Sequence, residues 1–88
     1  MFNMQVLALG GNQIGDTGMI PLADALGKGA LPQLKELNLY KNQIGDVGMQ
    51  ALAGAVSKGA LASLENIELA GNPGNAAPVD KALRERKK

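Results

Sequence analysis

The sequence predicts an α/β solenoid of about three stacked strand–helix units, with a parallel sheet on the concave side and helices on the convex side. The first observation is a repeat: LALGGNQIGDTGM at residues 7–19 returns as LNLYKNQIGDVGM at residues 37–49, and IELAGN at residues 67–72 begins a third copy. The period is 30 residues. Within a unit, the apolar spacing changes from every second residue to about every 3.6 residues, which indicates a strand followed by a helix. Strands that alternate with helices in this way run parallel and stack into a curved array.

The strand of the second unit is expected at residues 36–40. Leu37 and Leu39 are apolar and are expected to face the core, while Glu36, Asn38 and Tyr40 alternate with them and face outward.

The helix of the second unit is expected at residues 47–57, because apolar residues recur at i, i+3, i+4 and i+7 from Met49. Asp46 is expected to cap its start, and Gly59 is expected to end it in a left-handed conformation. Asp16 and Gly29 are expected to do the same one unit earlier. In the first unit, Pro21 falls inside the corresponding segment. Proline removes a backbone hydrogen bond there, so that helix is expected to be irregular or late to start.

The whole chain is expected to form a single domain with a closed C-terminal end. In the third unit, Pro73 and Gly74 replace residues that the first two units share, and the segment that follows is a short, polar helical pattern. The expected parts are the units at about 1–30, 31–60 and 61–76 and a capping helix at about 77–88.

Asn12, Asn42 and Asn72 recur between a strand and the following turn. An Asn side chain carries both donors and acceptors, so a stacked column of them can satisfy the turn backbone of its own unit and of the next one. Loss of the Asn42 side chain is therefore predicted to cost about 1–3 kcal/mol of stability.

The pattern LxLxxNxIGDxGMxxLAxAL resembles the leucine-rich repeat, in particular the longer ribonuclease inhibitor type, and the resemblance covers nearly the whole chain. It implies that the concave sheet wall is where a protein ligand sits, with a plain solvated strand face as the alternative. Tyr40 has the character of a binding hot spot. The candidate protein-binding residues are Glu36, Asn38, Tyr40, Lys41, Asn66 and Glu68.

Composition excludes several classes of function. The chain has no cysteine and no histidine, which removes disulfides, zinc fingers, imidazole metal ligands and thiol or imidazole catalysis, so neither a cofactor nor a metal is expected. The net charge of +1 and the two aromatic residues give little attraction for nucleic acid. No apolar run approaches the roughly 20 residues that span a bilayer, and no export signal is apparent, so an intracellular, cytoplasmic protein without membrane contact is expected.

Two segments only imitate chemical sites. Residues 10–17, GGNQIGDT, resemble a phosphate-binding loop, but Asp16 stands where the essential lysine belongs. Glu36 and Glu68 form a potential carboxylate pair, yet nothing in the sequence provides a pocket that would exclude water from them. No catalytic residue is therefore assigned. The basic tail at residues 84–88 is interpreted as the solvated end of the cap, with an acidic partner or lipid as the alternative.

The expected function is a non-catalytic protein interaction module that uses the concave sheet face and whose partner the sequence does not identify. The alternative is a structural or self-associating end of a longer repeat protein, in which the uncapped first strand pairs with another chain or forms a homodimer. The resemblance also suggests a regulatory alternative, because GTPase-activating proteins of the Ran type share this repeat class. That activity needs a far longer array of repeats.

Overall fold

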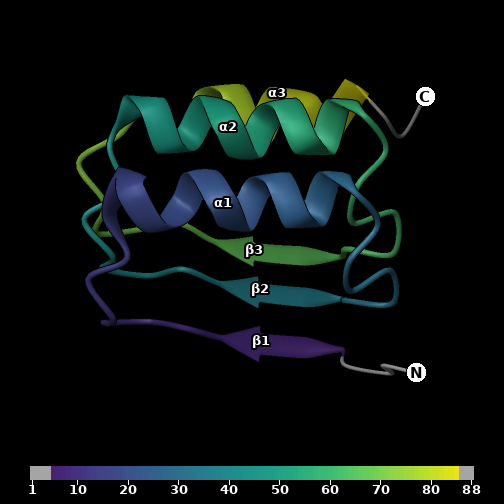
Figure 1. Cartoon of the computed structure of the whole chain (residues 1–88), viewed down its shortest axis with the longest axis horizontal. Helices are drawn as coiled ribbons and strands as arrows, with labels where there is room; N and C mark the ends of the chain where they lie inside the picture. The colour runs from purple at the N-terminus through teal and green to yellow at the C-terminus, as the bar shows by residue number, and fades with distance from the viewer. Residues whose placement is uncertain (1–4, 86–88) are drawn as a thin grey trace.

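A computed structural model describes residues 5–85 as three strand–helix units stacked in chain order (Figure 1). The three strands are parallel and lie in the order β1-β2-β3, and the three helices lie side by side over one face of the sheet. This arrangement confirms the predicted α/β solenoid. The elements are β1 (Val6–Ala8), α1 (Gly15–Gly27), β2 (Glu36–Asn38), α2 (Asp46–Ser57), β3 (Asn66–Glu68) and α3 (Ala77–Glu85).

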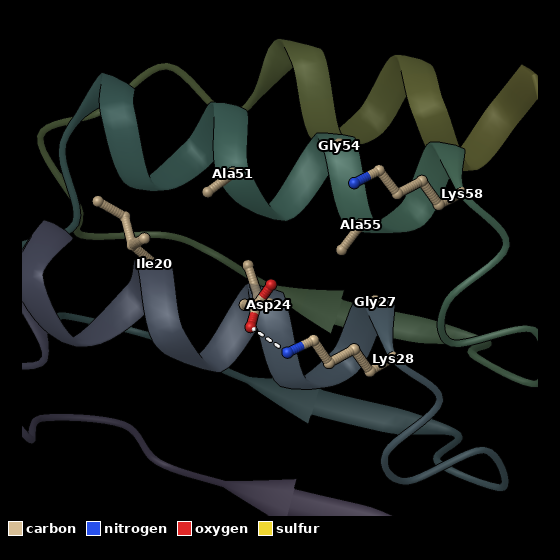
Figure 2. Close-up of a pocket in the computed structure, with 9 residues that line it drawn as sticks. Ile20, Asp24, Gly27, Lys28, Ala51, Gly54, Ala55 and Lys58 are labelled. Carbon is tan, nitrogen blue, oxygen red and sulfur yellow. Dashed lines mark ion pairs between the residues drawn. The ribbon is translucent and has the colours of Figure 1, made fainter.

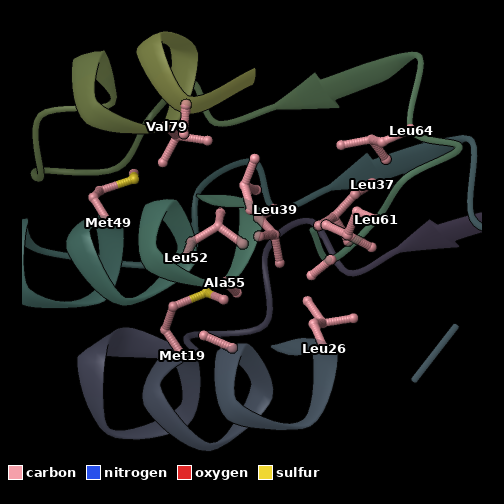
Figure 3. Close-up of a cluster of buried hydrophobic side chains, with 14 of the residues drawn as sticks. Met19, Leu26, Leu37, Leu39, Met49, Leu52, Ala55, Leu61, Leu64 and Val79 are labelled. Carbon is pink, nitrogen blue, oxygen red and sulfur yellow. The ribbon is translucent and has the colours of Figure 1, made fainter. Parts of the chain in front are cut away.

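The core lies between the sheet and the helices (Figure 3). Leu37 and Leu39 enter it from the second strand segment, and Met49, Leu52 and Val56 enter it from one stripe of α2. Each of these side chains is at most 1% exposed. Full burial of such a side chain stabilises the fold by about 1.5–3 kcal/mol, so this stripe fixes α2 against the sheet.

The helices α1 and α2 end as the sequence predicts. Gly59 has a φ of +97°, and its N–H donates to the carbonyl of Val56 while the N–H of Ala60 donates to that of Ala55. This pair of bonds is the Schellman arrangement, in which a left-handed glycine satisfies the last carbonyls of a helix. Gly29 ends α1 in the same way.

The second strand is shorter than the expected 36–40, because its regular part ends at Asn38. Interstrand bonds nevertheless continue beyond it: the N–H of Leu39 donates to Glu68 and the N–H of Lys41 donates to Ala70. Lys41 has a φ of +54°, so the chain leaves the sheet at that point.

The expectation of a late or irregular first helix is wrong. Helix α1 begins at Gly15 and continues through Pro21. The bond that a residue at position 21 would make runs to the carbonyl of Thr17, and both Thr17 and Pro21 are exposed. Water can therefore solvate the carbonyl that proline leaves without a donor, and the helix tolerates the ring on its outer face.

The third unit closes onto the second. The N–H of Gly74 donates to the carbonyl of Ile44 at 2.8 Å, and a Cβ at Gly74 would collide with the backbone of Gly45 and Asp46. A side chain such as that of Ile44 therefore has no room at this position of the third unit. In α3, only Val79 and Ala82 are buried, which leaves a largely polar outer surface. Residues 86–88 of the predicted cap lie outside the described part.

The asparagines bond across the units. The Oδ1 atom of the fully buried Asn42 accepts from the N–H groups of Asn12 and Ile14 at 2.8 and 3.3 Å. Its Nδ2 donates to the carbonyl of Leu9 at 2.8 Å. Asn72 repeats the pattern one unit later, accepting from the N–H groups of Asn42 and Ile44. The side-chain oxygens of Asn42 and Asn72 thus satisfy the turn of the preceding unit, whereas Asn12 donates to carbonyls of its own unit.

The expectation that Asp16 and Asp46 each cap their own helix is wrong. The N-cap of α2 is Gly45, and no side chain of its own unit caps that helix. Instead, Asp16 of the preceding unit accepts from the N–H groups of Gly45 and Gly48 at 2.7 and 2.8 Å. The free N–H groups at the start of one helix are therefore satisfied by a carboxylate from the neighbouring unit.

Candidate protein-binding face

The outward residues of the three strands form a regular grid on the sheet face that the helices leave open. The parallel register places each outward residue directly beside its equivalent one repeat away. Backbone bonds at the strand ends carry the same alignment one row further. From β1 to β3, the rows read Val6, Glu36 and Asn66, then Ala8, Asn38 and Glu68, then Gly10, Tyr40 and Ala70.

Tyr40 is the aromatic residue of this grid and is 40% exposed. Its neighbours in the row, Gly10 and Ala70, are small. The Nζ atom of Lys41 lies 5.2 Å from the ring centroid, within the range of a cation–π interaction. A Cβ at Gly71 would lie 2.6 Å from Cγ of Lys41, so the glycine there makes room for the lysine side chain.

Glu36 and Glu68 are exposed and lie on a diagonal of the grid. Among residues 5–85, the ion pair that the structure shows joins Lys28 and Asp24 on the helical layer, and neither of these glutamates takes part in an ion pair. Both carboxylates are therefore free to accept hydrogen bonds from a partner's donors.

Asn38 is less available than the other candidates. Its side chain is half-buried, and its Oδ1 accepts from the N–H of Tyr40 at 2.9 Å. This bond holds the backbone under the tyrosine, so Asn38 positions Tyr40. Asn66, in the row beside Glu36, is exposed.

The face changes character from one edge to the other. Val6 is 54% exposed and Ala8 is also exposed, so the β1 edge is apolar. The rest carries amides, carboxylates and the Tyr40 ring. A contact surface of this kind combines an apolar part with a polar part that fixes orientation.

The loop that imitates a phosphate site has another use in the fold. Asp16, at the end of this loop, turns its carboxylate onto the N–H groups of Gly45 and Gly48, so it serves as the anion at the start of the next helix, α2. Within the described residues, no group of three or more acidic, histidine or cysteine side chains is arranged to hold a metal ion. Across the same residues, no helix combines the length and the apolar character needed to cross a membrane.

A second hollow lies on the helical layer, and the sequence reasoning missed it. Figure 2 shows this α1/α2 groove, a cavity of about 440 Å³ between the two helices. The one signal in the sequence is Gly54, a glycine inside a helical pattern that has no turn to make. The groove is lined by Ile20, Ala23, Asp24, Gly27, Lys28, Ala51, Gly54, Ala55 and Lys58.

Comparison with known proteins gives one match. The family model described as Leucine Rich repeat matches residues 1–23 and 30–53, more than half of the chain. No curated protein and no solved structure matches the chain. The two matched segments contain the strands β1 and β2 with the turns and helix starts that follow them, and the third unit completes the same stack. With its repeated strand, asparagine turn and helix, the chain belongs to the leucine-rich repeat family.

Proposed function

We propose that the chain is a non-catalytic protein interaction module that binds a partner protein on the open sheet face. Leucine-rich repeat proteins generally mediate protein–protein interactions and are typically non-catalytic. The observation that carries the proposal is the exposed ring of Tyr40, which lies beside two carboxylates without ion pairs. Asn38 accepts from the backbone N–H of this residue, and the Nζ of Lys41 lies over its ring. An exposed tyrosine ring is the kind of side chain that dominates binding energy.

We also infer the ribonuclease inhibitor-like subtype. The support is the period of 30 residues and the presence of an α-helix of 13 or 12 residues after each of the first two strands. Location inside the cell stays a prediction of the sequence.

The test compares two single variants of the full chain. Tyr40→Ala removes the ring on the sheet face, and Val47→Ala removes an even more exposed apolar side chain from α2, on the opposite layer. Each protein is crosslinked in a cell lysate, and the captured proteins are identified by mass spectrometry. We expect a specific partner that wild type and Val47→Ala capture and that Tyr40→Ala loses, with unchanged melting temperatures for both variants.

Two results would contradict this role. If Tyr40→Ala captures the same partners as wild type, the ring is not the contact. If the variant melts at a markedly lower temperature and loses the partner together with its fold, Tyr40 has a packing role.

A second candidate function is self-association through the first unit. Strand β1 forms an edge of the sheet in the described structure. Leu7, Leu9, Ile14 and Leu22 are only half-buried, whereas their counterparts one unit later are at most 1% exposed. A second chain placed against this end would bury them. Molar mass by light scattering over a concentration series tests the idea: a stable dimer supports it, and a monomer at every concentration refutes it.

A further inference from the structure

We propose that the α1/α2 groove is a second docking surface, and that its occupant is an acidic amphipathic segment of a partner protein. In this complex, an apolar side chain of the segment fills the groove and a carboxylate of the segment meets Lys58. The proposal concerns the helical layer and is independent of the sheet face.

The size of the groove fits side chains of a protein segment. Its volume of about 440 Å³ lies within the range of about 300–1,000 Å³ that is usual for ligand sites. Ala51 and Ala55 point into it from α2, and Ile20 stands at one end on α1 (Figure 2). Ile20 is 46% exposed, which adds an apolar wall that an occupant would cover.

Packing within the chain does not explain why the groove is open. A Cβ built at Gly54 would meet no heavy atom within 4 Å, and one at Gly27 would meet only Cβ of Ala55, at an ordinary 3.9 Å. Gly48, in the same helix, has no such room, because a Cβ there would lie 2.6 Å from Oδ1 of Asp16. Glycine is a weak helix former, so Gly54 weakens α2 without any gain in packing. Its effect is to keep space free.

The open groove is particular to one pair of helices. One period of 30 residues later, Lys81 and Arg84 stand at the positions of Ala51 and Gly54. Both are exposed on α3, so long charged side chains border the corresponding junction between α2 and α3. The repeat therefore does not require small residues at these positions.

Charge identifies the kind of occupant. Lys28 and Lys58 flank the groove at the C-terminal ends of α1 and α2, and their side chains extend back along the two helices (Figure 2). Lys28 pairs with Asp24 at 3.2 Å, but the two side chains are 78% and 66% exposed, which makes the pair weak. Lys58 has no ion pair within residues 5–85. The groove lining carries two lysines and one aspartate, so its net charge is +1 and it favours an acidic segment over a basic one.

The groove and the sheet face lie on opposite layers of the molecule (Figure 1). A partner in the groove therefore leaves Tyr40 uncovered. The chain could hold one partner on each layer at the same time, which would make it a connector of two proteins.

The test uses nuclear magnetic resonance of the ¹⁵N-labelled full chain with two synthetic amphipathic helical peptides. The peptides share one leucine stripe, and their polar positions are glutamate in one and lysine in the other. We expect the acidic peptide to shift the amide signals of Gly27, Gly54 and Lys58 and to bind at least about tenfold more tightly than the basic peptide. Tyr40→Ala is expected to leave this binding unchanged.

A matched pair of variants tests the groove itself. Gly54→Leu fills the groove, and its Cβ meets open space, so the fold is retained. Gln50→Leu adds the same side chain at another exposed position of α2, outside the lining of the groove. We expect Gly54→Leu to weaken binding of the acidic peptide at least about tenfold and Gln50→Leu to leave it unchanged, with both melting temperatures at or above that of wild type.

Four outcomes would overturn the proposal. They are equal binding of the two peptides, shifts that map to the sheet face, no shift at a peptide concentration of about 1 mM, and groove shifts that follow the protein concentration without peptide. The last result would assign the groove to a second copy of this chain.

Discussion

Replacement of Asn42 by alanine is expected to lower the free energy of unfolding by about 2 kcal/mol. The substitution leaves the N–H groups of Asn12 and Ile14 without the acceptor that the Oδ1 atom of Asn42 provides. Each group costs about 1 kcal/mol, at the low end of the usual range, because both hydrogen bonds are only partly buried. The carbonyl of Leu9 still accepts from the Nδ2 of Asn12, and the carbonyl of Tyr40 still accepts from the N–H of Gly11. The loss of the Nδ2 donor of Asn42 therefore adds little to the cost.

The assay is thermal unfolding followed by circular dichroism, with urea unfolding to obtain the free energy. A loss of about 2 kcal/mol corresponds to a decrease in melting temperature of about 8–16 °C for a chain of this size. Asn12→Ala is the matched control. Asn12 is exposed, and its Nδ2 donates to the carbonyls of Leu9 and Gly10, of which the first also receives the Nδ2 of Asn42. Its replacement is expected to cost less than about 1 kcal/mol.

Asn72→Ala extends the series and separates two explanations. Asn72 is less buried than Asn42, but its oxygen serves the N–H groups of Asn42 and Ile44, which belong to residues that are 0% exposed. If unsatisfied donors set the cost, Asn72→Ala is at least as destabilising as Asn42→Ala, and Asn12→Ala is the mildest. An unchanged melting temperature for Asn42→Ala, or equal losses for all three variants, would refute the reasoning.

Three further predictions concern other contacts. Asp16→Ala is expected to lower the free energy of unfolding by about 1–2 kcal/mol in urea, because two N–H groups at the start of α2 lose their acceptor. Asp46→Ala is expected to cost less, because Asp46 accepts one bond at an exposed site. Equal losses for the two variants would contradict this explanation. Gly48→Ala is expected to destabilise the chain by about 1–3 kcal/mol through overpacking. Gly54→Ala, in the same helix, is expected to raise the free energy of unfolding by about 0.5–1 kcal/mol, because its Cβ meets open space. A change of the same sign in both variants would contradict this reasoning. Tyr40→Ala is expected to change the melting temperature by no more than about 2 °C while it reduces partner capture, and a larger decrease would assign the ring to packing.

The repeated architecture could be predicted from the sequence because it depends on periodicity, which is local information. Alternation in the strand segment places Leu37 in the core and Glu36 outside whatever the rest of the molecule does. The helical spacing around Met49 and the left-handed position of Gly59 are equally local, and both are found as predicted. The same alternation predicts which residues of the candidate face point outward, but the sequence does not give their arrangement in space.

The tertiary structure decided the contacts that cross from one unit to the next. Asp16 is spaced to cap its own helix, yet it bonds to the next one, because stacking brings the free N–H groups of Gly45 and Gly48 within reach. Local rules predict that Pro21 breaks the first helix, but the helix continues because position 21 faces water. The groove beside Gly54 depends on how two helices meet. Periodicity along the chain fixes which face a residue occupies, but only the stacking of units fixes what that face touches.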